Sequence, residues 1–245
     1  MTIKGLIFDV NGTLIDIWTE DGGEDACRAT ANFLALRGVR ISPEGLREVY
    51  FGLNRHQRQE SPEIFPEFDI LKIFETVVGR YAVKKTGPAG RRRLAMTAAL
   101  VFRASGCRRL TLYRGVLEVL TALRGRYPMT VVSDGQSLWA AAELRAAGLG
   151  GFFPTPVISG DYGYRKPDGR LFDAGVRQLG IAPGEAVYIG NDMYRDIRGA
   201  AAAGMRTVFF RSNQGDHSFH GTEPDYVIRD FNELPLALKF LSGGE

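Results

Sequence analysis

The chain has 245 residues, of which 44% are hydrophobic and 24% are charged, an ordinary globular composition that excludes a disordered or collagen-like protein. This length is sufficient for one large domain, or two smaller ones, with a substantial core. The formal charge of +3, from 31 Lys and Arg against 28 Asp and Glu, is too small to indicate a nucleic-acid or membrane partner.

Cysteine usage and the pattern at the N-terminus bear on the cellular compartment. Cys27 and Cys107 form neither a disulfide framework nor a zinc-binding spacing, so we expect reduced thiols. The first residues lead directly into a strand pattern without the apolar core of a signal peptide. No apolar run approaches the ~18 residues that a membrane helix needs. We therefore expect a cytoplasmic protein, and its oligomeric state stays open.

The chain begins with a near-continuous apolar run at residues 3–8, which is typical of a buried parallel strand. Four helical patterns follow, with no convincing strand between them, at residues 26–36, 43–51, 71–83 and 91–104. We interpret residues 17–107 as a helical insert between the first two strands of a sheet. One stretch of this insert is rich in arginine, namely Arg91, Arg92, Arg93, Arg103, Arg108 and Arg109. It is either a solvated helix face or a guide for an anionic substrate.

From about residue 110, short apolar runs alternate with helical patterns. We expect strands at residues 129–133, 157–159, 186–189, 207–210 and 226–228. We expect helices at residues 138–147, 170–179, 194–203 and 235–241. This alternation is typical of a parallel sheet with helices on both faces. The sequence therefore predicts an α/β protein, with a Rossmann-like core of residues 1–16 plus 108–245 and a helical domain of residues 17–107.

Polar residues follow three of the expected strands at their carboxyl ends. They are Asp9, Ser133, Asp134, Asn191 and Asp192. In an open α/β sheet these ends share one crevice, which is where ligands bind. Asp9 and Asp192 together would offer Mg²⁺ the few carboxylates that it uses beside water and phosphate. An aspartate after a strand is also a common turn residue or helix N-cap, so each one alone is ambiguous.

Four segments resemble the four motifs of the haloacid dehalogenase-like (HAD) hydrolases. They are Phe8–Leu14 (FDVNGTL), Ser133 after its strand, Arg165–Asp168 (RKPD) with Leu171 and Phe172, and Gly190–Asp196 (GNDMYRD) with Gly199, Ala200, Ala203 and Gly204. They occur in the family's order and span most of the chain. The resemblance implies that residues 17–107 form an α-helical cap, as in the subgroup that includes many small-molecule phosphatases.

The resemblance also implies roles for individual residues in a Mg²⁺-dependent phosphatase acting on a small phosphorylated metabolite. Asp9 would attack phosphorus and form an aspartyl-phosphate, and Lys166 would neutralise charge on Asp9 and on the phosphate. The catalytic set is Asp9, Asn11 and Lys166. The phosphate-binding set is Thr13, Ser133, Asp134 and Gly135. The metal-binding set is Asp9, Asn11 through its backbone carbonyl, Asp192 and Asp196.

Two positions depart from the family's pattern. The family's phosphatases carry an aspartate two residues after the nucleophile, and it protonates the leaving group. This chain has Asn11 there, and a carboxamide cannot perform such general acid–base catalysis, which is worth ~10²–10⁴-fold. Asn191 directly follows Gly190, where many relatives carry an acid, so either Asn191 or Asp192 would reach the metal.

Three interpretations follow from these departures. The protein is a phosphatase that is slow, favours good leaving groups or takes its proton from the cap. Alternatively it is a 2-haloacid dehalogenase-type hydrolase, since halide leaves without a proton. Or it is a catalytically weak binding or regulatory protein that keeps the fold. The sequence does not identify the substrate.

Overall fold

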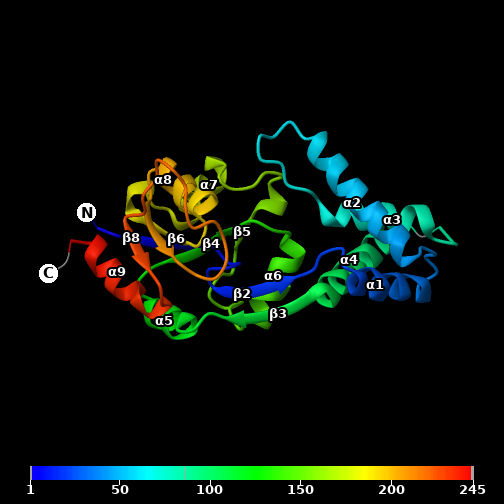
Figure 1. The fold of residues 1–245 in the computed structure, drawn as a ribbon, viewed down its shortest axis with the longest axis horizontal. Helices are drawn as coiled ribbons and strands as arrows, with labels where there is room; N and C mark the ends of the chain where they lie inside the picture. Colours follow the sequence, from blue (N-terminus) through cyan, green and yellow to red (C-terminus); the bar gives the residue numbers. More distant parts are fainter. Residues whose placement is uncertain (1, 86, 244–245) are drawn as a thin grey trace. The chain divides into compact units, whose positions relative to one another are not determined.

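Six parallel strands form one sheet in the structure, a computed structural model that describes residues 2–85 and 87–243 (Figure 1). The strands are β1 (Gly5–Phe8), β4 (Met129–Ser133), β5 (Val157–Ile158), β6 (Ala186–Gly190), β7 (Arg206–Phe210) and β8 (Tyr226–Ile228). Their order is β5-β4-β1-β6-β7-β8, with every pairing parallel. The predicted α/β fold is confirmed. Because β1 lies between β4 and β6, the carboxyl ends of these three strands meet at one crevice.

Both faces of the sheet are covered by helices, because successive side chains of a strand point to opposite faces. Leu6 and Phe8 of β1 belong to a core cluster with residues of α5 (Val116–Leu123), α6 (Ser137–Ala146) and α9 (Leu234–Leu241). Ile7 belongs to a second cluster with residues of α7 (Gly169–Leu179) and α8 (Gly199–Ala202). Figure 1 shows α7 and α8 on one side of the strands and α5 and α9 on the other. The sequence does not predict α5.

The segment after β6 differs from the prediction. A continuous helix over residues 194–203 is expected, but Met193–Arg198 is a π-helical segment that leads into α8. The predicted helix is present, with a π-helical first part and an α-helical second part. A π-helical turn accommodates one residue more than an α-helical turn and is frequent at functional sites. It therefore changes the directions in which side chains near its start point.

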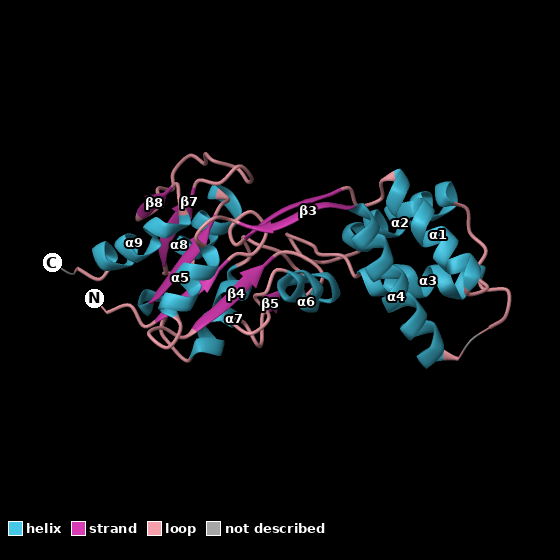
Figure 2. Ribbon diagram, turned by 90° about the horizontal axis from the view of Figure 1, so that it is seen from below, coloured by secondary structure: helices cyan, strands magenta, loops and turns pink. Residues whose placement is uncertain are grey.

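The second structural unit contains four helices among its described residues, 18–85 and 87–109 (Figure 2). They are α1 (Glu24–Leu36), α2 (Pro43–Gln59), α3 (Ile70–Tyr81) and α4 (Pro88–Gly106). Ser42 caps α2 as predicted, with its Oγ accepting the Gly45 N–H at 3.0 Å. The aromatic rings of Tyr50, Phe74 and Phe102 form the core, with Phe102 centroids 4.7 Å from Tyr50 and 5.5 Å from Phe74. The predicted helix over residues 43–51 continues to Gln59.

The chain divides into a unit of Met1–Ile17 with Leu110–Glu245, which we call the core unit, and a unit of Trp18–Arg109, which we call the helical unit. A two-stranded ribbon of β2 (Ile15–Thr19) and β3 (Cys107–Leu112) contains both boundaries. The sequence does not predict the ribbon. That the helical unit acts as a cap stays a prediction. In the part of the chain that the structure describes, every helix is too short or too polar to cross a bilayer.

Candidate active site

Asp9 lies directly after β1 and is 4% exposed. Its Oδ1 accepts hydrogen bonds from Lys166 Nζ at 2.7 Å and from Ser133 Oγ at 3.0 Å. Its Oδ2 lies 3.2 Å from Thr13 Oγ1. The structure thus brings together four residues that the sequence places in three distant segments. The carboxylate of Asp9 is both oriented and charge-balanced.

Lys166 is buried and uses all three of its N–H donors within the protein. Besides Asp9, its Nζ donates to Asp196 Oδ1 at 2.5 Å and to the Tyr188 hydroxyl at 3.1 Å. Burial alone would lower the pKa of Lys166, but the negative charges of Asp196 and Asp9 raise it above its ordinary value. The ammonium group therefore stays protonated throughout the neutral pH range.

Asp196 is held beneath the loop that follows β6. Its Oδ2 accepts the backbone N–H groups of Asn191 and Asp192, each at 3.0 Å. Burial raises the pKa of Asp196 above its ordinary value, and the charge of Lys166 opposes that rise. A Cβ on Gly190 would lie 2.5 Å from the Asp196 Cβ, so only glycine fits there. Asp196 thus fixes both Lys166 and the neighbouring loop.

Asp192 is held by Arg195 and by the start of the π-helical segment. Its Oδ2 accepts from Arg195 Nη2 at 2.8 Å and Nε at 3.0 Å, while its Oδ1 caps the π-helical segment through the N–H of Tyr194 and Arg195. Burial would raise the pKa of Asp192, but hydrogen bonds and charge from Arg195 outweigh burial and hold it below its ordinary value. The amide of Asn191 faces the site, with its Oδ1 2.9 Å from Thr13 Oγ1.

A cavity of about 210 Å³ opens at Asp9. Its lining residues are Asp9, Asn11, Asp134, Arg165, Lys166, Asn191, Arg195, Asp196, Gln214 and Gly215. Three carboxylates and three cations are present in this set, so the lining is neutral overall. The cavity therefore suits a polar ligand small enough for this volume.

Three more predicted site residues lie at or near this cavity. Asn11 lines it, and its Oδ1 is buried without a hydrogen-bond partner among the described residues. Asp134 lines it too, with its Oδ1 accepting the Lys166 backbone N–H at 2.9 Å. The backbone N–H of Gly135 donates to Ser159 Oγ at 2.9 Å, which leaves it directed away from a ligand.

Tyr188, Arg195 and Gln214 also belong to the site, although the sequence analysis assigns them no role. The Tyr188 hydroxyl lies 2.9 Å from the Val132 carbonyl and 3.1 Å from Asp196 Oδ1. A tyrosine in a fully buried strand needs a partner for its hydroxyl, and this signal could have identified it. Gln214 lies in an irregular loop, where no sequence pattern indicates that it reaches the site.

The donors around the cavity offer limited support for the predicted Mg²⁺ site. Asp9 contributes a carboxylate, and Asn11 and Asn191 contribute neutral oxygens, whereas Asp192 and Asp196 are engaged by Arg195 and Lys166. Among the described residues, no three or more His, Cys, Asp or Glu side chains gather as a metal site. Mg²⁺ binds through as few as one carboxylate together with waters and substrate phosphate. The donor set meets this lower limit.

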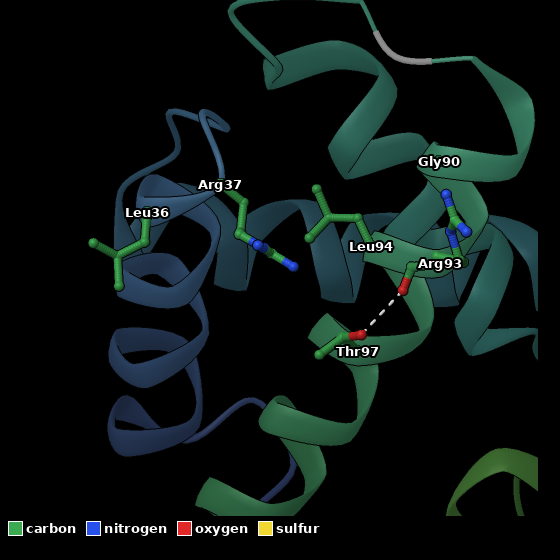
Figure 3. A pocket seen from close by; sticks show the side chains of 6 residues that line it. All are labelled: Leu36, Arg37, Gly90, Arg93, Leu94 and Thr97. Atoms are coloured by element: carbon green, nitrogen blue, oxygen red, sulfur yellow. Dashed lines mark hydrogen bonds between the residues drawn. The ribbon is translucent and has the colours of Figure 1, made fainter.

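The helical unit contains a larger hollow of about 620 Å³ between α1 and α4. Figure 3 shows its lining residues, Leu36, Arg37, Gly90, Arg93, Leu94 and Thr97. Leu36 is 87% exposed, and the two arginines are also exposed. The lining has no carboxylate, and its one side-chain hydroxyl, that of Thr97, donates to the Arg93 carbonyl at 3.1 Å. The buried carboxylates that could act in catalysis line the cavity at Asp9.

Known proteins are similar to this chain over most of its length. Residues 3–204 match the family model described as haloacid dehalogenase-like hydrolase. The chain is 29% identical to glyceraldehyde 3-phosphate phosphatase of Methanopyrus kandleri, covering 94% of this chain and 92% of that protein. It is 26% identical to N-acylneuraminate-9-phosphatase of Rattus norvegicus, covering 97% and 94%.

Solved structures give the same fold. The 2-haloacid dehalogenase from Pseudomonas syringae pv. Tomato DC3000 superposes with a TM-score of 0.69 at 22% identity, covering 98% of this chain and 99% of that one. Identity this low supports the fold alone. Evidence for the reaction type therefore comes from the sequence relatives and from the geometry of the site.

Proposed function

We propose, from the premise that the chain belongs to the haloacid dehalogenase-like hydrolase family, that it hydrolyses phosphate monoesters of a small metabolite through Asp9. The observation that carries the proposal is the buried Asp9 carboxylate held by Lys166 and Ser133 at the wall of a polar cavity. The names of the two sequence relatives, both phosphatases, support the same bond type.

In the first half of the reaction, an Asp9 carboxylate oxygen attacks phosphorus. The new O–P bond forms as the bond to the leaving-group oxygen breaks, which gives an aspartyl-phosphate. Lys166 neutralises charge on Asp9 and on the phosphoryl oxygens, while Ser133 and Thr13 hydroxyls lie beside the carboxylate to hydrogen-bond the same group. Catalysis then depends on positioning and charge stabilisation.

Mg²⁺ is part of this proposal. Asp9, with neutral oxygens of Asn11 and Asn191, would hold the ion, and it would neutralise charge on the phosphoryl group when bound. Asp192 and Asp196 as ligands stay predictions. Because Asp9 would be its one carboxylate ligand, we expect Mg²⁺ to bind weakly in the absence of phosphate.

Asn11 restricts the choice of substrate. Since its carboxamide cannot protonate a leaving group, esters whose leaving group is a weak base should react fastest. Installing Asn11→Asp should raise the rate for an alkyl phosphate by ~10²–10⁴-fold while changing an aryl phosphate far less. Parallel assays of both esters measure this. An unchanged alkyl phosphate rate would mean that the cavity is not a phosphatase site lacking only its acid.

The direct test is an assay of phosphate esters with Mg²⁺, using Asp9→Asn as the control. This variant keeps the size of the side chain and removes the nucleophile, so we expect activity to fall by more than ~10³-fold. Asp173→Asn, a carboxylate on α7 outside the cavity lining, should keep full activity.

A second candidate function is halide displacement from a 2-haloacid, favoured by the carboxamide at Asn11, because a halide leaves without a proton. Halide release without added metal, together with no phosphate ester turnover, would establish it. A folded protein inactive in both assays would instead favour the binding or regulatory interpretation.

A further inference from the structure

We propose that Asp134 is the general base that removes a proton from the hydrolytic water, and that Asn11 orients this water. The inference rests on the proposed function, because it concerns the second half of that reaction. The water oxygen forms a bond to phosphorus, and the bond between phosphorus and the Asp9 carboxylate breaks. The water proton passes to Asp134 Oδ2, and inorganic phosphate leaves. Asp134 then returns the proton to solvent.

The first observation is the placement of Asp134. It follows Ser133 at the carboxyl end of β4, lines the same cavity as Asp9, and has a side chain only 8% exposed. Its Oδ1 accepts the Lys166 backbone N–H at 2.9 Å, which fixes the carboxylate in the wall of the cavity. One oxygen thus anchors the side chain, and the other is available for chemistry.

The second observation is that Asp134 Oδ2 is buried without a hydrogen bond among the described residues. A buried acceptor without a hydrogen bond lowers the stability of the folded protein by about 1–3 kcal/mol, so buried acceptors nearly always have a partner. Arg165 Nε and Arg195 Nη1 lie 3.6 Å and 3.9 Å from it, beyond hydrogen-bond length. The oxygen therefore has two ion-pair partners but no hydrogen-bond donor, and a water in the cavity would supply that donor.

Charged groups surround Asp134 in the cavity. Arg165, Lys166 and Arg195 line it from the loop before α7 and from the π-helical segment. Asp9 and Asp196 line it too, and both lie against Lys166. Asp134 has Arg165 and Arg195 as its ion-pair partners.

The third observation is a second orphan acceptor in the same cavity, the buried Oδ1 of Asn11. A water molecule has two O–H donors, and two acceptors without partners suit one such molecule. Asn11 would accept one hydrogen bond and set the direction of attack. Asp134 would accept the other and take the proton. The carboxamide at position 11 is then compatible with hydrolysis of the aspartyl-phosphate, although it cannot protonate a leaving group.

The test compares wild type with Asp134→Asn, using p-nitrophenyl phosphate and Mg²⁺. The asparagine keeps a side-chain oxygen for the Lys166 N–H and loses the base. Since p-nitrophenolate leaves without a proton, we expect the variant to retain a burst of one product per site. Its steady-state rate should then fall by ~10²-fold or more. Mass spectrometry of the acid-quenched variant should reveal a phosphoryl group on the peptide that contains Asp9.

The control is Asp161→Asn, an exposed aspartate of the short helix Ser159–Asp161, which should behave as wild type. If Asp134→Asn does not fold, Asp134→Ala with added formate replaces it, because formate supplies a small external base in the space of the missing carboxylate. Restored turnover in formate supports the inference.

Three results would overturn it. Asp134→Asn could turn over at the wild-type rate, or lose its burst together with its turnover while melting normally. Asp134→Ala could turn over equally slowly with and without formate. Each leaves the proposed function intact as long as wild type turns over. A wild type without turnover or phosphoenzyme would instead contradict the proposed function itself.

Discussion

A buried charge cluster of the core unit differs from an exposed ion pair of the helical unit in how far its geometry is constrained. In the core unit, the side chains of Lys166, Asp9 and Asp196 are 3%, 6% and 1% exposed and lie in direct contact. In the helical unit, the pair of Arg92 and Glu75 is 61% and 28% exposed, with its atoms 3.2 Å apart. Burial of charge is tolerated only where every group has a partner, so the core cluster must keep one geometry. Surface charges carry no such constraint.

Replacing Lys166 by methionine should give the largest effect on stability. The change leaves Asp9 and Asp196 buried as unpaired like charges, and breaking such a cluster costs about 3–5 kcal/mol of unfolding free energy. Urea denaturation measures it. Arg92→Met removes the exposed pair and should cost under ~1 kcal/mol. Equal losses of unfolding free energy in the two variants would contradict the distinction between the buried cluster and the exposed pair.

Asp192→Asn should have an intermediate effect, about 1–3 kcal/mol at pH 7, because it removes charged hydrogen bonds to Arg195. The folded pKa of Asp192 lies below its unfolded value of 3.8, so this stabilisation is present above pH 3.8 and is lost as pH falls through the folded pKa. Urea titrations at pH 7 and in strong acid measure the difference between variant and wild type. A difference that grows on acidification would contradict this assignment.

Asn191→Asp should give the smallest effect, seen in Mg²⁺ affinity. It places a second carboxylate beside Asp9 on the cavity wall, and we expect binding to tighten by roughly 10-fold in calorimetry without substrate. Asp192→Asn should leave the affinity unchanged, since its carboxylate contacts Arg195. Weaker Mg²⁺ binding by Asp192→Asn would identify Asp192 as the ligand.

Much of the core unit could be predicted from sequence. Buried parallel strands such as β1, β4 and β6 are continuous apolar runs, which leave a clear signal. The ribbon strand β3 (CRRLTL) mixes arginines with apolar residues and has no buried residue, so its pairing with β2 is not visible in the pattern. The C-terminal part of α2 could not be predicted either, because its residues GLNRHQRQ lack the apolar stripe that indicates a helix.

The site, too, has features that the sequence predicts and features that it does not. Lys166, Ser133 and Asp9 meet because strand ends converge, which depends only on topology. The direction of Asp192 depends on the π-helical turn after β6, and the i, i+4 spacing with Asp196 does not reveal that turn. Tertiary hydrogen bonding, and not local sequence preference, decides which of two adjacent residues faces the cavity.

The most direct test of the account is to trap the intermediate on Asp9. Wild-type enzyme turning over an aryl phosphate is quenched in acid, digested and analysed by mass spectrometry. If Asp9 is the nucleophile, a phosphoryl group is found on the Asp9 side chain and none in Asp9→Asn. Turnover with a phosphoryl group on another residue, or turnover that persists in Asp9→Asn, would contradict it.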